Sequence, residues 1–257
     1  MTLEAIYNEG KDELYQWKRA GEVGQDAPMN NDDDDFLEGR SRARGERPKQ
    51  AKPTTPGTIS VDQLSKLEGD AKTYVLKNGQ KTGHEHMAAI DLQTGKRLAQ
   101  GTSHDPGRVY LSDEVTQLAS DPTQKIAYHH NHPDGFSLSA GDLRVMAKRP
   151  GLYEVTAYGH DGSWFLAQRR DVRDLELMLD VVKIELRHQG QWAAQRGLSL
   201  KGLEAHLANL ALSQAGLIEY QFSLDPIRDA FCRHEQSALT QIVEALVLRI
   251  RQMRTQP

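Results

Sequence analysis

The chain contains a single cysteine, Cys232, among its 257 residues. One thiol cannot form an intrachain disulfide, and it excludes a structural zinc site built from several cysteines. No apolar run approaches the length of a membrane span, and the first ten residues lack the basic and apolar regions of a secretory signal. We therefore expect a cytoplasmic protein with no membrane partner.

Neither sign of charge dominates the chain, which has a formal net charge of -4 and a pI near 6.2. This balance gives no general attraction to nucleic acid or to an anionic membrane, so neither is an expected partner. Apolar residues make up 38% of the chain, which is enough for a core but not for a core through every segment. We expect one catalytic domain with appended segments.

The first 57 residues are predicted to lie outside that domain. Residues 1–24 contain apolar side chains at helical spacing and predict a short amphipathic helix. Residues 25–57 contain four consecutive aspartates (Asp32 to Asp35), then a basic run from Arg40 to Lys52, and read as a disordered linker. The basic half leaves contact with nucleic acid open as an alternative.

Residues 58–170 predict an α+β domain, a mixed sheet flanked by helices, because strand patterns and short helical patterns do not alternate regularly. The expected elements, in order, are a helix over Ser60 to Leu67 with Ser60 as its cap, a strand at Thr73–Leu76, a hairpin of 85–91 and 97–102, a helix at 112–120, a strand from Lys125 that ends at Pro133, a helix after Ser139, and a hairpin of 153–158 and 164–167.

Residues 171–257 change to long helical periodicity and predict an all-α segment of three helices. Asp225 and Pro226 have the residue types of a cap and first position of the last helix. The apolar stripes indicate either a bundle that covers the sheet or a surface for homo-oligomer formation.

Two imidazoles and a carboxylate are placed where one cation can collect them. His130 and His132 are two residues apart on a predicted strand, so they face the same side. Ser139 and Asp142 have the spacing that starts a helix, and a carboxylate in that first turn is kept ionised by the helix dipole. The sequence therefore predicts a Zn²⁺ site of His130, His132 and Asp142.

A catalytic zinc has three protein ligands and one open position, and hydrolysis also needs a group that accepts a proton. Glu85 is the best candidate, because it opens an apolar strand that can lie beside the histidine strand. Ser139 can cap its helix, donate to a developing oxyanion, or do both. The neighbouring His84, His86 and His129 are interpreted as structural residues.

Glu85, His130-Asn131-His132-Pro133 and Ser139-Ala140-Gly141-Asp142 together resemble the JAMM (MPN-plus, or JAB) metalloprotease motif. The resemblance covers roughly residues 60–168 and is strongest to bacterial, phage and RadC-type members. It implies an MPN/JAB fold and a zinc-dependent peptidase or isopeptidase that cuts a ubiquitin-like or sulfur-carrier-like tail. It also implies that Glu85 is the general acid/base and Ser139 the oxyanion stabiliser.

The interval between His132 and Ser139 is one residue shorter than in many family members, which affects the shape of this loop more than the ligand set. Two alternatives remain beside the protein or peptide substrate. One is a RadC-like, DNA-associated factor that uses the arginine-rich linker. The other is a phage or mobile-element assembly module that uses its helical tail.

Overall fold

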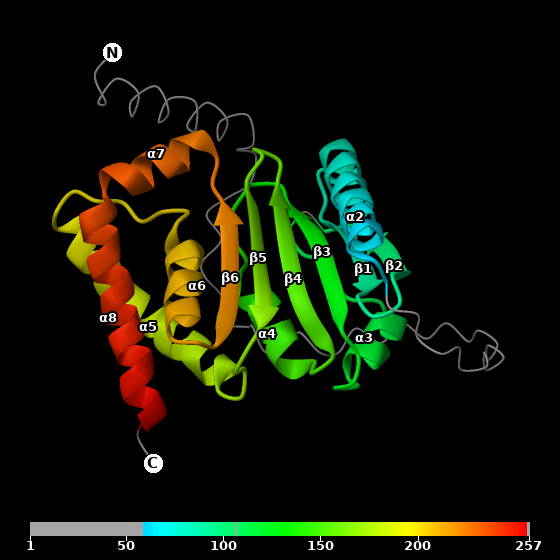
Figure 1. Cartoon of the computed structure of the whole chain (residues 1–257). Coiled ribbons are helices and arrows are strands. Elements are labelled where there is room, and N and C mark those ends of the chain that lie inside the picture. The colour runs from blue at the N-terminus through cyan, green and yellow to red at the C-terminus, as the bar shows by residue number, and fades with distance from the viewer. Residues whose placement is uncertain (1–58, 106, 256–257) are drawn as a thin grey trace. The chain divides into compact units, whose positions relative to one another are not determined.

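The structure is a computed structural model and describes residues 59–105 and 107–255. The expected N-terminal helix (1–24) and charged linker (25–57) lie outside the described residues. Within the described part of the chain, seven helices flank one six-stranded mixed sheet (Figure 1). The expected mixed α/β class is confirmed at this level.

The strands lie in the order β2-β1-β3-β4-β5-β6 across the sheet. The β3 and β4 strands are parallel, and every other neighbouring pair is antiparallel. Both expected hairpins, β1–β2 and β4–β5, are present. The strand bounds are β1 (His86–Asp91), β2 (Lys96–Thr102), β3 (Ile126–His132), β4 (Leu152–Gly159), β5 (Trp164–Arg169) and β6 (Ile218–Ser223).

Helices cover both faces of the sheet. Ala88 and Ile90 of β1 pack with Ala71 and Val75 of α2, whereas the intervening Ala89 belongs to the larger core on the opposite face. This alternation follows from the two-residue period of a strand. The helix bounds are α2 (Val61–Thr82), α3 (Asp113–Ala119), α4 (Ala140–Lys148), α5 (Leu175–Ala194), α6 (Glu204–Gln214), α7 (Pro226–His234) and α8 (Gln236–Thr255).

The expected strand at Thr73–Leu76 is wrong, because these residues lie inside α2. The expected cap is confirmed: the Ser60 hydroxyl accepts from the Gln63 amide at 3.3 Å. The helix then runs for 22 residues, from Val61 to Thr82, with Gly83 as its C-cap, and it buries Ala71, Val75 and Gly79, which are four residues apart. Packing of that stripe on the sheet overrides the strand preference of the β-branched and aromatic residues.

The expectation of an all-α segment over 171–257 is also wrong, because β6 extends the sheet beyond β5. Apolar residues alternate at Ile218, Tyr220 and Phe222, a strand pattern that the longer helical periodicity around it obscured. The hydrophobic core continues across residue 170, since Phe165, Leu175 and other buried residues of both parts pack in one cluster.

The last helix begins as expected and is then interrupted. The Asp225 side chain accepts from the Ile227 amide at 2.9 Å, and Pro226 occupies the first turn. This helix, α7, ends at His234, and α8 begins two residues later.

Most of the apolar stripe of α8 is buried within the chain, although Leu248 is 59% exposed. A homo-oligomer through these helices stays a prediction.

Among the described residues, no helix combines the length and the apolar character required to cross a membrane.

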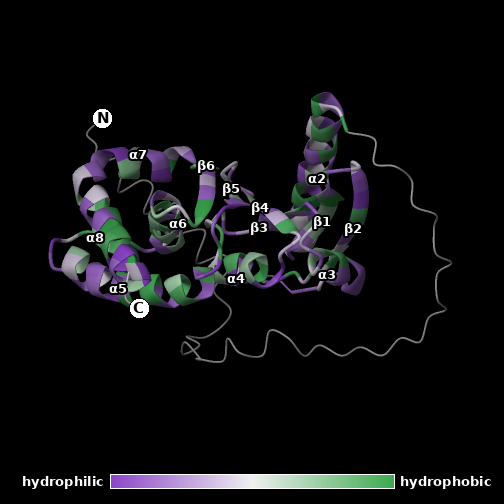
Figure 2. Ribbon diagram, turned by 60° about the horizontal axis from the view of Figure 1, so that its bottom comes forward, coloured by the Kyte–Doolittle hydropathy of each residue, from purple (hydrophilic) through white to green (hydrophobic). Residues whose placement is uncertain are grey.

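The edge strand β2 is hydrophilic over most of its length (Figure 2).

Helix α2 lies close to β3 at Gly79. A Cβ atom there would lie 2.3 Å from Nδ2 of Asn131 and 2.8 Å from Nε2 of His160. Asn131 is fully buried and cannot move aside, because its side chain bonds to the backbone on the β1 side. Gly69 is also inside α2, but a Cβ there would meet no atom within 4 Å.

We predict that Gly79→Ala lowers the free energy of unfolding by about 1–3 kcal/mol through overpacking. The matched variant Gly69→Ala should raise it by roughly 0.5–1 kcal/mol, because alanine is the better helix former. Denaturant unfolding of both variants measures the difference. Equal stabilisation by the two substitutions would contradict the close approach of α2 to Asn131.

Candidate metal centre

Strand β3 places His130 and His132 on the sheet face that also carries Tyr128. Both histidines are buried, with 1% and 7% of their surface exposed. The strand lies between β1 and β4, with His130 opposite Met87 on one side and Ala157 on the other. Hydrogen bonding on both edges fixes the register of the strand, and hence the direction of both imidazoles.

Helix α4 brings Asp142 to these imidazoles. Ser139 is the N-cap: its hydroxyl accepts from the Asp142 amide at 3.2 Å. In return, Asp142 Oδ2 accepts from the Ser139 amide at 2.7 Å and from its hydroxyl at 2.8 Å. At the other end of the helix, the Arg169 guanidinium donates to the carbonyls of Met146 and Arg149. Helix α4 is therefore anchored at both ends.

The predicted ligands come together in the structure. The two Nε2 atoms of His130 and His132 are 2.9 Å apart. Asp142 Oδ1 lies 3.3 Å from Nε2 of His130, and Oδ2 lies 3.7 Å from Nε2 of His132. Tetrahedral zinc with bonds near 2.0–2.1 Å requires ligand atoms roughly 3.3 Å apart. The donor set therefore fits a metal ion of this kind, and these are the residues that could hold one.

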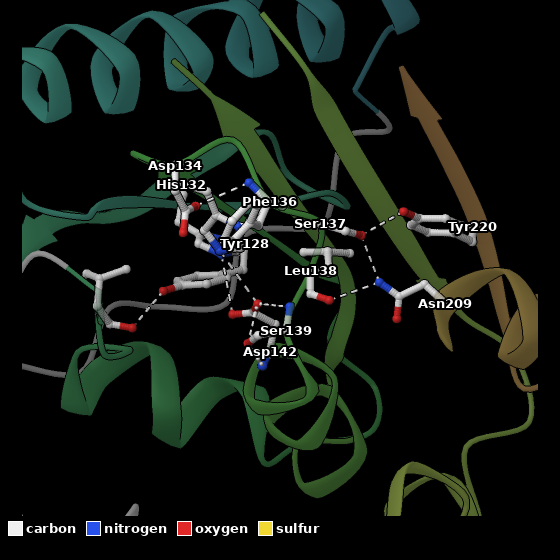
Figure 3. Close-up of polar contacts among 12 residues, drawn as sticks. Tyr128, His132, Asp134, Phe136, Ser137, Leu138, Ser139, Asp142, Asn209 and Tyr220 are labelled. Atoms are coloured by element: carbon white, nitrogen blue, oxygen red, sulfur yellow. Dashed lines mark hydrogen bonds and ion pairs between the residues drawn. The ribbon is translucent and has the colours of Figure 1, made fainter. Parts of the chain in front are cut away.

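The surroundings orient the imidazoles for metal binding. Nδ1 of His132 lies 2.7 Å from the Phe136 carbonyl oxygen, which can only accept, so Nδ1 carries a proton. Nε2 of the neutral ring is then free to ligate. The Tyr128 ring stacks on His130 with centroids 5.1 Å apart, and its hydroxyl donates to the Val109 carbonyl at 3.0 Å. Figure 3 places Tyr128, His132 and Asp142 side by side.

The pKa values follow from this packing. Burial raises the pKa of Asp142, but the opposing effects of His130, His132 and Ser139 are larger. The pKa therefore lies below its usual range, and the carboxylate stays ionised. Burial lowers the pKa of His130, and Asp142 more than reverses that effect. Burial and His130 lower the pKa of His132. The site therefore combines an ionised oxygen ligand with at least one neutral imidazole.

Glu85 directly precedes β1, on the same face as Met87, which pairs with His130. Burial raises the pKa of its carboxyl to about 7, with His130 opposing and Asp142 reinforcing this shift. The backbone on both sides of Glu85 is tied to β3 by Asn131. The Asn131 side chain accepts from the His86 amide at 2.7 Å and donates to the His84 carbonyl at 3.2 Å.

The histidines interpreted as structural do not join the three ligands. His129 points to the opposite face, where its Nδ1 lies 3.2 Å from the Tyr158 hydroxyl, and burial lowers its pKa to about 4. His86 contacts the Thr82 hydroxyl at 2.9 Å. The two-residue period of β3 separates His129 from its neighbours, as expected for a strand.

We compared the chain with protein-family models, with curated proteins and with solved structures, and none of the three comparisons gives a match. The function of the site therefore has to be inferred from its residues and geometry.

Several residues around the site were not identified from the sequence. Tyr128 is two residues before His130, so strand periodicity alone could have found it. Asn131 lies inside the histidine motif, but its backbone partners are more than 40 residues away. Asn209 and Tyr220 contact the loop before Ser139 from the C-terminal part of the chain, and no local pattern indicates this.

We predict that the purified chain binds one equivalent of Zn²⁺. His132→Ala and Asp142→Ala should each weaken binding by more than the roughly 10–100-fold that is typical of an outer-shell partner. Competition with a chelator measures the affinity. The exposed His188, substituted by Ala, serves as the control and should bind like the native chain. Unchanged affinity in both ligand variants would rule out this site.

A second prediction concerns Glu85 in the metal-free chain. Its carboxyl binds a proton in the folded state up to pH 7 but releases it at about 4.5 when unfolded, so folding becomes less favourable between these values. Glu85→Gln should match the native chain below this window and exceed its free energy of unfolding by about 1–3 kcal/mol above it.

Denaturant unfolding at several pH values, with a chelator present, tests this prediction. The exposed Glu244 on α8, substituted by Gln, is the control for removal of a glutamate charge. A difference between Glu85→Gln and the native chain that does not change with pH would show that burial does not perturb Glu85.

Proposed function

We propose that the chain is a zinc-dependent metallopeptidase or isopeptidase, which hydrolyses an amide or isopeptide bond next to a flexible, ubiquitin-like tail. The convergence of His130, His132 and Asp142 on one point is the observation that carries this proposal. Two imidazoles and one carboxylate are a ligand set of hydrolytic zinc enzymes. Zn²⁺ at this place would supply Lewis acidity, which polarises a carbonyl and lowers the pKa of water.

Glu85 provides the proton transfers of this mechanism. With a pKa of about 7, its carboxylate can accept a proton from the attacking water near neutral pH. The same carboxyl can then donate that proton to the nitrogen of the leaving amine, which returns Glu85 to its ionised form. Tethering of its backbone by Asn131 restricts where the carboxylate can move.

Ser139 has two parts in the proposal. Its hydroxyl caps α4 and donates to Asp142 Oδ2, which positions the oxygen ligand. Its proposed second part is to donate to the oxyanion that forms on the substrate carbonyl. For this, the hydroxyl must turn away from Asp142 when substrate binds.

The MPN/JAB assignment within the α/β class belongs to the same proposal. It is supported by the order of Glu85, the two histidines, Ser139 and Asp142, and by their placement at the ends of β1, β3 and α4. Two alternatives predicted from the sequence remain. The RadC-like, DNA-associated function depends on residues 40–52, which lie outside the described residues, and the assembly-module function depends on the exposed surface of the helical tail.

The proposal predicts cleavage of a ubiquitin-like protein joined through its C-terminal tail to a second protein. A panel of such fusions, incubated with the zinc-loaded chain and analysed by mass spectrometry, tests it. Glu85→Gln should keep its zinc and lose about 10²–10⁴-fold in turnover, because it cannot accept a proton. His132→Ala should lose both zinc and turnover.

Metal analysis accompanies the cleavage assay, because two histidines and one carboxylate also occur in non-haem iron(II) enzymes. Zinc content near one equivalent agrees with the proposal. Iron in its place, or cleavage by Glu85→Gln at the native rate, would overturn the mechanism.

A further inference from the structure

We propose that Asn209 and Tyr220 are positioning residues, which hold residues 133–138 and thereby set the positions of His132 and Asp142. We call residues 133–138 the metal-site loop. The inference rests on the proposed metal centre, and it adds a structural role for the C-terminal region in building that centre.

The metal-site loop connects two ligands and touches both. Within the loop, the Phe136 carbonyl accepts from Nδ1 of His132 at 2.7 Å and so fixes the orientation of that imidazole. At its end, Leu138 precedes Ser139, which caps the helix that carries Asp142. A movement of residues 136–138 therefore changes the separation between the His132 imidazole and the Asp142 carboxylate.

Buried side chains from α6 and β6 hold this loop (Figure 3). The Asn209 amide nitrogen donates to the Leu138 carbonyl at 2.9 Å and to the Ser137 hydroxyl at 3.0 Å. The Tyr220 hydroxyl lies 2.7 Å from the Ser137 hydroxyl and 3.0 Å from Nδ1 of His206. All four polar side chains, those of Ser137, Asn209, Tyr220 and His206, are buried.

One arrangement of protons satisfies every member of this network. Asn209 donates to Ser137, so the Ser137 hydroxyl can donate to Tyr220, whose hydroxyl can donate to Nδ1 of His206. Burial, and then Arg228, lower the pKa of His206 to about 4, so at neutral pH its Nδ1 is able to accept. A chain of this kind leaves no member without a partner, and each bond strengthens the next.

Two further contacts lie in the middle of the loop, at Gly135 and Phe136. A Cβ atom on Gly202 would lie 3.0 Å from the Phe136 ring, so the segment before α6 lies directly against that side chain. The Arg228 guanidinium of α7 bonds to Asp161, and a Cβ atom on Gly135 would lie 2.7 Å from a guanidinium nitrogen of Arg228. The C-terminal region thus contacts the loop at four successive residues, Gly135 to Leu138.

Asn209 is the position where this role can be tested. Asn209→Leu keeps the approximate size of the side chain but removes both donated bonds, which leaves the Leu138 carbonyl buried without its partner. The released loop should move away. Tyr220→Phe removes one hydroxyl and leaves both Asn209 bonds, so its effect should be smaller.

The experiment measures two quantities on the full chain at a temperature where circular dichroism shows every variant folded. The first is Zn²⁺ affinity by chelator competition, and the second is amide hydrogen exchange of residues 135–139 in the metal-free chain. Leu246→Ala is the control, since it removes a buried side chain of α8 and destabilises the chain without altering the hydrogen-bonded network.

We expect Asn209→Leu to weaken zinc binding by about 10–100-fold and to speed exchange in the loop, as for loss of an outer-shell partner. Leu246→Ala should leave both quantities within about twofold of the native chain once the exchange rates are compared at equal global stability. Native exchange and native affinity in Asn209→Leu would overturn the positioning role.

The two proposals can fail separately. If the native chain binds no zinc, the proposed function fails, and the exchange rates alone decide whether Asn209 holds the loop. If zinc binds but Asn209→Leu changes only the exchange rates, the loop is held but does not set the ligand positions, and the inference is wrong while the metal centre stands.

Discussion

Asp142 lies beside two imidazole nitrogens at the start of α4, and its ionised form depends on several groups at once. Removal of a carboxylate from water is unfavourable unless nearby charges and donors compensate for the loss of hydration. Here the compensation comes from His130, from the Ser139 cap and from the position at the N-terminus of a helix. The register of β3 and the placement of α4 must therefore both be correct for the site to exist.

The local parts of this site follow from the sequence. His130 and His132 share a face because a strand has a period of two, and Ser139 caps α4 because its spacing to Asp142 matches a capping box. Short-range rules are sufficient for these residues, since each depends on neighbours within a few positions. Glu85 is different: its strand is local, but its place beside His130 depends on the pairing of β1 with β3.

The remaining features depend on contacts that no short-range rule contains. Residues 73–76 have a strand composition, but the stripe from Ala71 to Gly79 packs on the sheet as a helix. Strand β6 has a clear alternation, yet its place in the sheet is determined by pairing with β5. Asn209 and Ser137 are 72 residues apart, and only the fold brings their side chains together. Prediction from one sequence fails where long-range packing decides between local alternatives.

The outer edge of β2 has a consequence for how copies of this chain can meet. Its backbone groups on that side have no strand partner among the described residues, and such an edge is normally a template for pairing with another chain. Lys96 and Arg97 stand on this strand, and an irregularity in its pairing with β1 falls at Ala89 and Ile90. Repulsion between like charges and a bent edge both oppose continuous sheets built from many copies.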